Sequence, residues 1–261
     1  MYDNLPAEIS HNAHPAHKLT LKLVTSDDGR PFRCNGCREP GSGEGRRYRC
    51  DTCEFDLHTS CAVAESTLKH PLFGDLEFKL LHSPSPPSAD GKFCNACGHV
   101  TSGFVYHCSS KDLDLHPCCA ALKMETVLPG GHMLELCKEA KKDCLVCREK
   151  GHPAGTSWNK KFLDALRKHK LWAYRWNYGG GDDGYLHIAC MKKIAVQSWE
   201  QTYQDSPGGG IVEASVPVMK SMMQWRLFRN TDNSSREKTA AIELVANTAQ
   251  IFSQASSSAP H

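Results

Sequence analysis

The sequence predicts small zinc-stabilised α+β units, arranged as a tandem of three β-rich zinc fingers followed by a helical C-terminal tail. Two observations indicate this fold class. The 261-residue chain contains 14 cysteines and 14 histidines, and histidine at the abundance of cysteine favours metal ligation over disulfide bonds. The same order of paired ligands also recurs along the chain, which is typical of repeated domains. We therefore expect reduced, metallated thiols.

The most regular copy of the pattern contains eight candidate ligands. Two C-x2-C pairs precede an H-x2-C pair, namely Cys34/Cys37, Cys50/Cys53 and His58/Cys61. A C-x2-C pair turns two thiolates toward one tetrahedral metal, and an H-x2-C pair adds two ligands from a short helical turn. His17 opens a stretch of alternating apolar residues that predicts a half-buried strand, and His70 follows the last pair. Eight ligands are enough for two four-coordinate zinc sites.

The motifs around these ligands resemble those of a known family. Pro31-Phe-x-Cys34, Tyr48-Arg-Cys50 and Lys69-His70-Pro71 are similar to motifs of the plant cysteine/histidine-rich divergent C-one domain. This domain is a relative of the zinc domain that binds diacylglycerol and phorbol esters. The resemblance covers residues 17–200 and implies two interleaved zinc sites in the first unit. One site would use Cys34, Cys37, His58 and Cys61, and the other would use His17, Cys50, Cys53 and His70.

The two later copies of the pattern retain fewer ligands. The second copy keeps Cys94, Cys97, His116 and Cys119, and the third keeps Cys144, Cys147, His187 and Cys190. In the second copy Lys111 stands where Cys108 should have a partner, so His82 and His132 are the remaining candidates for a further site around Cys108. In the third copy Trp176 stands in the place of Cys50. We therefore expect three to four structural zinc ions per chain.

The pattern divides the chain into five segments. We expect a flexible arm over residues 1–16 and three units over 17–70, 71–131 and 132–205. A linker, a helical segment and a disordered tail would make up 206–261. Within the third unit, apolar residues at helical spacing predict a short surface helix over Ser157–Lys170, and Gly179–Gly184 predicts a flexible loop. Ser234-x-x-Glu237 has the sequence of a helix capping box.

The ligand pattern indicates a structural metal rather than a catalytic one. Catalytic zinc has three protein ligands and an open position for water, whereas the ligands here occur in full sets of four. No carboxylate recurs beside them as a general base. We therefore expect a non-enzymatic protein in which zinc decides whether each unit folds, because units of about 50 residues have thin apolar cores.

The expected partner is a protein. The family resemblance implies an interaction module in intracellular signalling or in stress and developmental responses. Diacylglycerol is not the expected ligand, because the loop Arg38–Arg47 is charged and glycine-rich and would cost free energy to bury in a bilayer. The formal net charge of the chain, +2 at pH 7, does not by itself indicate a partner.

Nucleic acid is the alternative partner, through residues 138–193. This stretch carries 13 Lys or Arg against 6 Asp or Glu. Aromatic residues that are able to stack on bases are interleaved with this charge. They are Trp158, Trp172, Tyr174, Trp176 and Tyr178. The interpretation that we favour over base stacking is a packed aromatic cluster, in which tryptophans fill the space of lost zinc ligands.

A histone-reading plant homeodomain finger is a second alternative, because it has the same order of ligand pairs. It would require a further C-x2-C pair after Cys61, whereas Cys94/Cys97 begins a new repeat and the strand at His17 would have no explanation. The first residues lack the basic and apolar segments of a secretion signal. No run of about 18 apolar residues predicts a membrane-spanning helix. We therefore expect a cytoplasmic or nuclear protein.

Overall fold

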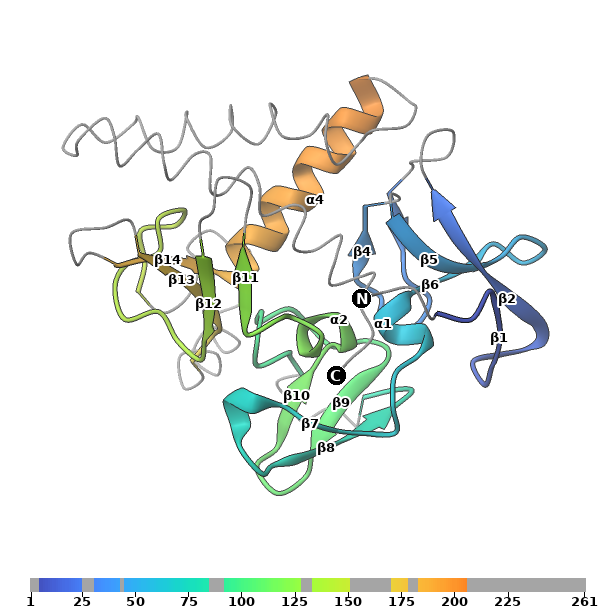
Figure 1. Cartoon of the computed structure of the whole chain (residues 1–261), viewed down its shortest axis with the longest axis horizontal. Coiled ribbons are helices and arrows are strands. Elements are labelled where there is room, and N and C mark those ends of the chain that lie inside the picture. The colour runs from blue at the N-terminus through green and yellow to red at the C-terminus, as the bar shows by residue number, and fades with distance from the viewer. Residues whose placement is uncertain are drawn as a thin grey trace.

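The computed structural model contains three four-stranded antiparallel sheets, each followed by a helix (Figure 1). It describes residues 5–24, 31–42, 45–84, 92–127, 133–150, 170–177 and 183–205. The predicted helix over Ser157–Lys170, the predicted loop over Gly179–Gly184 and the predicted tail over 206–261 lie mainly or entirely outside these residues. Within the described ranges, no helix combines the length and apolarity that crossing a bilayer requires. The predicted tandem of small β-rich units is confirmed.

The first sheet has the strand order β1-β2-β5-β6. Its strands are β1 (Glu8–His11), β2 (His14–Val24), β5 (Gly45–Cys50) and β6 (Phe55–His58), and β3 (Phe32–Arg33) and β4 (Pro40–Gly41) form a separate two-stranded ribbon. The predicted strand is present as β2, but its alternation holds only in part: Leu19 is fully buried next to exposed Lys18, whereas Leu23 is 63% exposed. Helix α1 (Thr59–Ala62) follows β6 directly.

The second and third sheets repeat this arrangement. The second contains β7 (Thr67–Lys69), β8 (Glu77–Leu81), β9 (Val105–Cys108) and β10 (Leu113–Leu115). The third contains β11 (Glu125–Val127), β12 (Met133–Cys137), β13 (Ala173–Asn177) and β14 (Asp183–His187). The short 3-10 helix η1 (Pro71–Phe73) separates β7 from β8. Helices α2 (Pro117–Ala120) and α4 (Ile188–Asp205) follow β10 and β14, as α1 follows β6.

A tyrosine occupies the same place in all three sheets. Tyr48, Tyr106 and Tyr174 are fully buried and pair across the sheet with Leu21, Leu80 and Leu136, respectively. Their hydroxyls donate hydrogen bonds to the carbonyl oxygens of Pro6 (2.8 Å), Glu65 (2.9 Å) and Lys123 (2.9 Å). Buried tyrosine hydroxyls need such partners. The shared register shows that the units are structural copies, and it assigns equivalent residues between them.

Each sheet begins earlier in the chain than the sequence predicts. β1 pairs with β2, with Glu8 opposite Thr20, so the segment predicted as a flexible arm over 1–16 contributes a strand. β7 and β11 extend the second and third sheets in the same way, to residues before the predicted boundaries at 71 and 132. These strands have only three or four residues. Their sequences are therefore too short for a clear period, and only pairing with the next strand defines them.

The three units share one core and dock in a repeated way. Most of their buried apolar residues form one continuous cluster, and three residues of the third unit form a small second one. The amide of Phe104 donates to the carbonyl of Gly36 at 2.9 Å, and the amide of Trp172 donates to the carbonyl of Ala96 at 3.0 Å. Gly36 and Ala96 hold equivalent positions inside C-x2-C pairs, so the second and third units each dock on a ligand loop of the unit before them. A Cβ at Gly36 would lie 2.7 Å from the Phe104 ring, so a larger residue there would have to displace this ring.

Candidate metal centres

The first C-x2-C pair of each unit lies on a tight loop with the same backbone geometry. In the first unit the amide of Cys34 donates to the carbonyl of Glu39, and the amide of Arg38 donates to the carbonyl of Cys34, both at 3.0 Å. The equivalent bonds at Cys94 and Cys144 measure between 2.7 and 2.9 Å. The residue after each pair has a positive φ, namely 66° at Arg38, 72° at Gly98 and 60° at Arg148. This turn directs both sulfurs of a pair toward one point.

Each H-x2-C pair lies where a strand ends and a helix begins. His58 ends β6 and Cys61 lies in α1, and the pairs His116/Cys119 and His187/Cys190 hold the same positions at α2 and α4. Residues three apart in a helical turn lie on one face, so both donors point the same way. The amides of His116 and His187 also donate to the sulfurs of Cys94 (3.4 Å) and Cys144 (3.3 Å).

Three tetrads result, and their donor atoms lie within 4.8 Å of one another. They are Cys34/Cys37/His58/Cys61, Cys94/Cys97/His116/Cys119 and Cys144/Cys147/His187/Cys190. All of these residues are buried except Cys147, which is half-buried. In each tetrad the histidine Nδ1 lies 3.4 to 3.5 Å from the second sulfur and 3.9 to 4.0 Å from the last one. Tetrahedral zinc, with bonds of about 2.3 Å to sulfur and 2.0 Å to nitrogen, separates these atoms by about 3.5 Å. The tetrads are therefore compatible with structural zinc.

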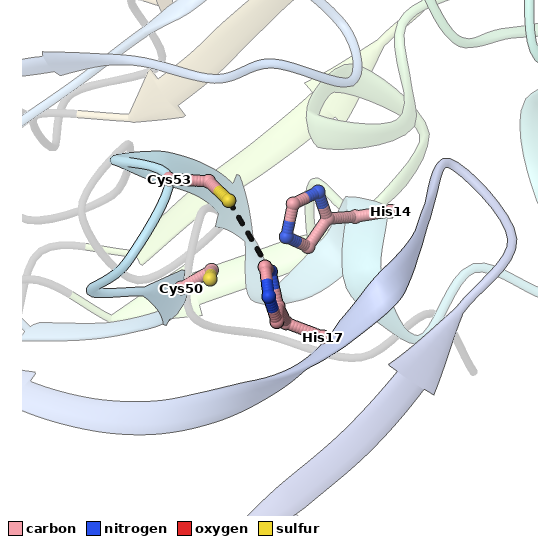
Figure 2. A group of neighbouring side chains, drawn as sticks. All are labelled: His14, His17, Cys50 and Cys53. Atoms are coloured by element: carbon pink, nitrogen blue, oxygen red, sulfur yellow. Dashed lines mark hydrogen bonds between the residues drawn. The ribbon is translucent and has the colours of Figure 1, made fainter.

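A fourth group of donors lies beside the first sheet (Figure 2) and consists of His14, His17, Cys50 and Cys53. Its two histidines come from β2, Cys50 ends β5, and Cys53 lies in the turn before β6. Both imidazole rings and both sulfurs lie around a common space, with Sγ of Cys53 3.2 Å from Nδ1 of His17. The ring of His14 also stacks on Phe55, with centroids 4.7 Å apart. His17 and Cys53 are exposed, so this group is closer to solvent than the three tetrads.

His70, which the family resemblance places in this group, lies elsewhere. It is buried before η1, where its Nδ1 accepts a hydrogen bond from the amide of Leu72 at 3.2 Å. Its ring packs against Trp172 of the third unit, with centroids 4.6 Å apart, and burial lowers the pKa of the ring to about 4. His14 takes its place because the β1–β2 hairpin, with His11 opposite His14, fixes His14 near His17. His70 instead contributes to packing between units.

The second unit has lost its equivalent of the exposed group. In the shared register, Lys111 corresponds to Cys53, and half-buried Leu76 corresponds to His17. The remaining cysteine, Cys108, is buried with Sγ 3.3 Å from the hydroxyl of Ser110. The other two candidates do not complete a site among the described residues, since His82 packs on Phe104 and His132 lies outside them.

In the third unit, aromatic packing replaces the equivalent group. Trp176 stands in the place of Cys50 and is 2% exposed. A Cβ on Gly184 would lie 2.6 Å from its ring, so the indole fills the space up to the opposite backbone. Trp172 and Tyr174 are fully buried as well, while Trp158 and Tyr178 lie outside the described residues. The three buried rings belong to the core, so they are not available for the base stacking that the nucleic-acid alternative requires.

Within each buried tetrad the pKa of one thiol is lowered and the pKa of another is raised. Burial by itself raises the pKa of Cys34, but hydrogen bonds from Cys37 and Cys61 outweigh burial and hold this pKa well below its ordinary value. Burial and the hydrogen bond to Cys34 raise the pKa of Cys61 well above its ordinary value. The pKa of Cys97 and that of Cys144 are lowered in the same way, against the effect of burial, by neighbouring thiols. Zinc binds thiolates, so it would displace the protons that these thiols share.

The loop predicted to exclude lipid, Arg38–Arg47, contacts the other units through Glu39. Glu39 and Ser42 are buried. The carboxylate of Glu39 contacts Lys192 of α4 and lies 3.6 Å from the rings of His99 and His116 in the second unit. Glu39 is therefore covered by protein, whereas Arg38 beside it is exposed.

A family model described as C1 domain matches the chain twice, over residues 12–62 and 69–120. These two stretches of the chain are therefore similar to C1 domains in tandem, and their cysteine and histidine groups fit a divergent C1-type domain. The searches of curated proteins and of solved structures each found no match. The third unit lies outside both matched stretches and is related to them by its sheet, its tyrosine and its tetrad. The plant homeodomain alternative lacks support, because Cys50 and Cys53 face His14 and His17 rather than a later C-x2-C pair.

Purified protein should contain four zinc ions per chain, one of which is removed first. The group at His14, His17, Cys50 and Cys53 is near solvent and supplies two thiolates, whereas each buried tetrad supplies three. A short treatment with EDTA should therefore lower the zinc content from four to three, as followed by elemental analysis over time. Two or fewer zinc ions in fresh protein, or loss of all four at one rate, would contradict this assignment.

Proposed function

We propose that this protein is a zinc-dependent, non-enzymatic interaction module that binds another protein in intracellular signalling or in stress and developmental responses. The observation that supports this proposal is the closed donor set of each buried tetrad. Three sulfurs and one imidazole nitrogen surround one point inside a packed core, which leaves no coordination position for water or a substrate. Zinc would then act through folding, because metal binding and folding are coupled in such small units.

The other ligand classes have less support. A lipid ligand would have to reach a charged loop whose Glu39 is buried against the other units. A nucleic acid would need exposed aromatic faces, but the described aromatic residues of 138–193 are in the core. Some of the basic charge is also paired, since Lys170 binds Glu139 at 2.7 Å and Arg175 binds Glu135 and Asp183. A partner protein would instead be recognised by the exposed surface of the three docked units.

The test compares three ligand classes on zinc-loaded protein. We expect no difference in sedimentation between vesicles with and without diacylglycerol, and no complex with single-stranded oligonucleotides at physiological salt. Proteins cross-linked to the chain in its native source should bind the purified zinc-loaded chain and fail to bind zinc-stripped chain. Diacylglycerol-dependent sedimentation, or an oligonucleotide complex that survives physiological salt, would contradict the proposal.

A further inference from the structure

The second tetrad differs from the other two buried tetrads at the outer nitrogen of its histidine. Nε2 of His116 lies 3.3 Å from the carbonyl oxygen of Val100 and 3.6 Å from a carboxylate oxygen of Glu39. Nε2 of His58 and Nε2 of His187 are buried without a hydrogen-bond partner. A partner on the outer nitrogen orients a metal-bound histidine and raises its basicity. Here the carbonyl of Val100, in the same unit, is the hydrogen-bond partner, and the carboxylate of Glu39, from the first unit, adds a negative charge beside the ring.

A lysine of the third unit reaches the same tetrad. Lys192 lies in α4, and its side chain is 7% exposed. Its Nζ contacts the carboxylate of Glu39 and lies 3.8 Å from Sγ of Cys97 and 3.8 Å from Sγ of Cys119. An ammonium group has three hydrogens to donate and no acceptor. The carboxylate of Glu39 and the sulfurs of Cys97 and Cys119 therefore provide one acceptor for each of these hydrogens, and they come from two different units.

The charge of the tetrad accounts for a lysine in this buried position. Zinc with three thiolates and a neutral imidazole has a formal charge of about −1. An ammonium group beside two of the thiolates compensates that charge and donates charge-assisted hydrogen bonds to sulfur. Glu39, Cys97 and His99 also bring donor atoms within 4.8 Å of one another. The ammonium of Lys192 contacts Glu39 and Cys97, so this group of donor atoms already has a cation and does not need a metal ion.

We propose that Glu39 and Lys192 are positioning residues of the second metal centre, and that this centre couples the docking of the three units. Glu39, from the first unit, places its carboxylate beside the ring of His116 and holds the ammonium of Lys192, while Lys192, from the third unit, binds the thiolates of Cys97 and Cys119. The inference rests on zinc occupying the second tetrad. It does not depend on which partner the protein binds, so failure of the proposed function would leave it intact.

Lys192→Met in the full-length, zinc-loaded protein tests the role of the ammonium. The methionine keeps an unbranched side chain but removes the charge and the donors. We expect the zinc affinity of the second tetrad to fall by about 10- to 100-fold, as for other partners of metal ligands, in competition with a chelator. In cadmium-substituted protein, the NMR signal of the second tetrad should shift while those of the first and third tetrads stay in place. Lys193→Met, at the exposed neighbouring residue, is the matched control and should change neither quantity.

Two further variants separate positioning from general stability. Lys192→Arg retains the charge and should recover most of the zinc affinity, whereas Glu39→Gln should weaken the same tetrad. The combined loss in Glu39→Gln/Lys192→Met should be smaller than the product of the single losses, because the two residues act together. Amide exchange should accelerate at Trp172, which docks the third unit on Ala96.

The outcomes distinguish positioning from general stability. If Lys192→Met does not fold, Glu39→Gln and Lys192→Arg provide the test. A selective loss at the second tetrad with faster exchange at Trp172 supports the proposal. An unchanged second tetrad, or an equal loss of zinc from all three buried tetrads, overturns it.

Discussion

Cys61→Ala is expected to release one zinc ion and to unfold the first unit as a block. Cys61 is fully buried and completes the tetrad that joins the loop at Cys34 to the end of β6. Structural zinc contributes about 10–16 kcal/mol apparent in finger peptides, which is as large as the stability of about 5–15 kcal/mol of a typical whole domain. Elemental analysis should show one zinc ion fewer, and hydrogen exchange should show lost protection throughout β2, β5 and β6.

Cys108→Ala is the matched control, since it also removes a buried sulfur. Cys108 has no set of metal-ligating neighbours among the described residues, so its substitution should cost about 1–2 kcal/mol, as for trimming a small core side chain. All four zinc ions should be retained. Release of a full equivalent of zinc by Cys108→Ala would show that the second unit holds two metals. Full protection of the first unit in Cys61→Ala would show that the metal does not hold it together.

The second large effect concerns zinc binding by the exposed group, for which the family resemblance implies His70 as a ligand and the structure places His14. His14→Ala should release the zinc of the exposed group, because His14 supplies one of its four donors. His70→Ala should retain all four zinc ions, because His70 packs against Trp172 instead. Its substitution should still lower stability, by about 2–5 kcal/mol as for other large-to-small core changes. Elemental analysis combined with denaturant unfolding separates the two results.

His17→Ala provides the positive control for the exposed group, since the sequence and the structure both place His17 there. It should match His14→Ala in zinc content. Zinc loss in His70→Ala, together with full retention in His14→Ala, would restore the ligand set that the family resemblance implies.

The three buried tetrads were predictable from the spacing of their residues, because their geometry is local. Each C-x2-C loop and each H-x2-C turn is built within a few residues, and the loops use the same backbone hydrogen bonds in every unit. Spacing along the chain is then enough to identify which donors point the same way. Recurrence of the pattern identified the number of units for the same reason. Whether these donors bind zinc in solution stays a prediction.

Contacts between segments distant in the chain could not be predicted in this way, because they depend on how the units pack. Whether His14 or His70 faces Cys53 depends on the β1–β2 hairpin and on the packing of Trp172, and neither has a local signal. The same is true of Lys192, which lies 153 residues after Glu39 and yet contacts it. From the sequence, Lys192 is one more basic residue and Trp176 one more aromatic residue. Their burial follows from the close packing of three units around one core, and close packing depends on shapes that spacing along the chain does not encode.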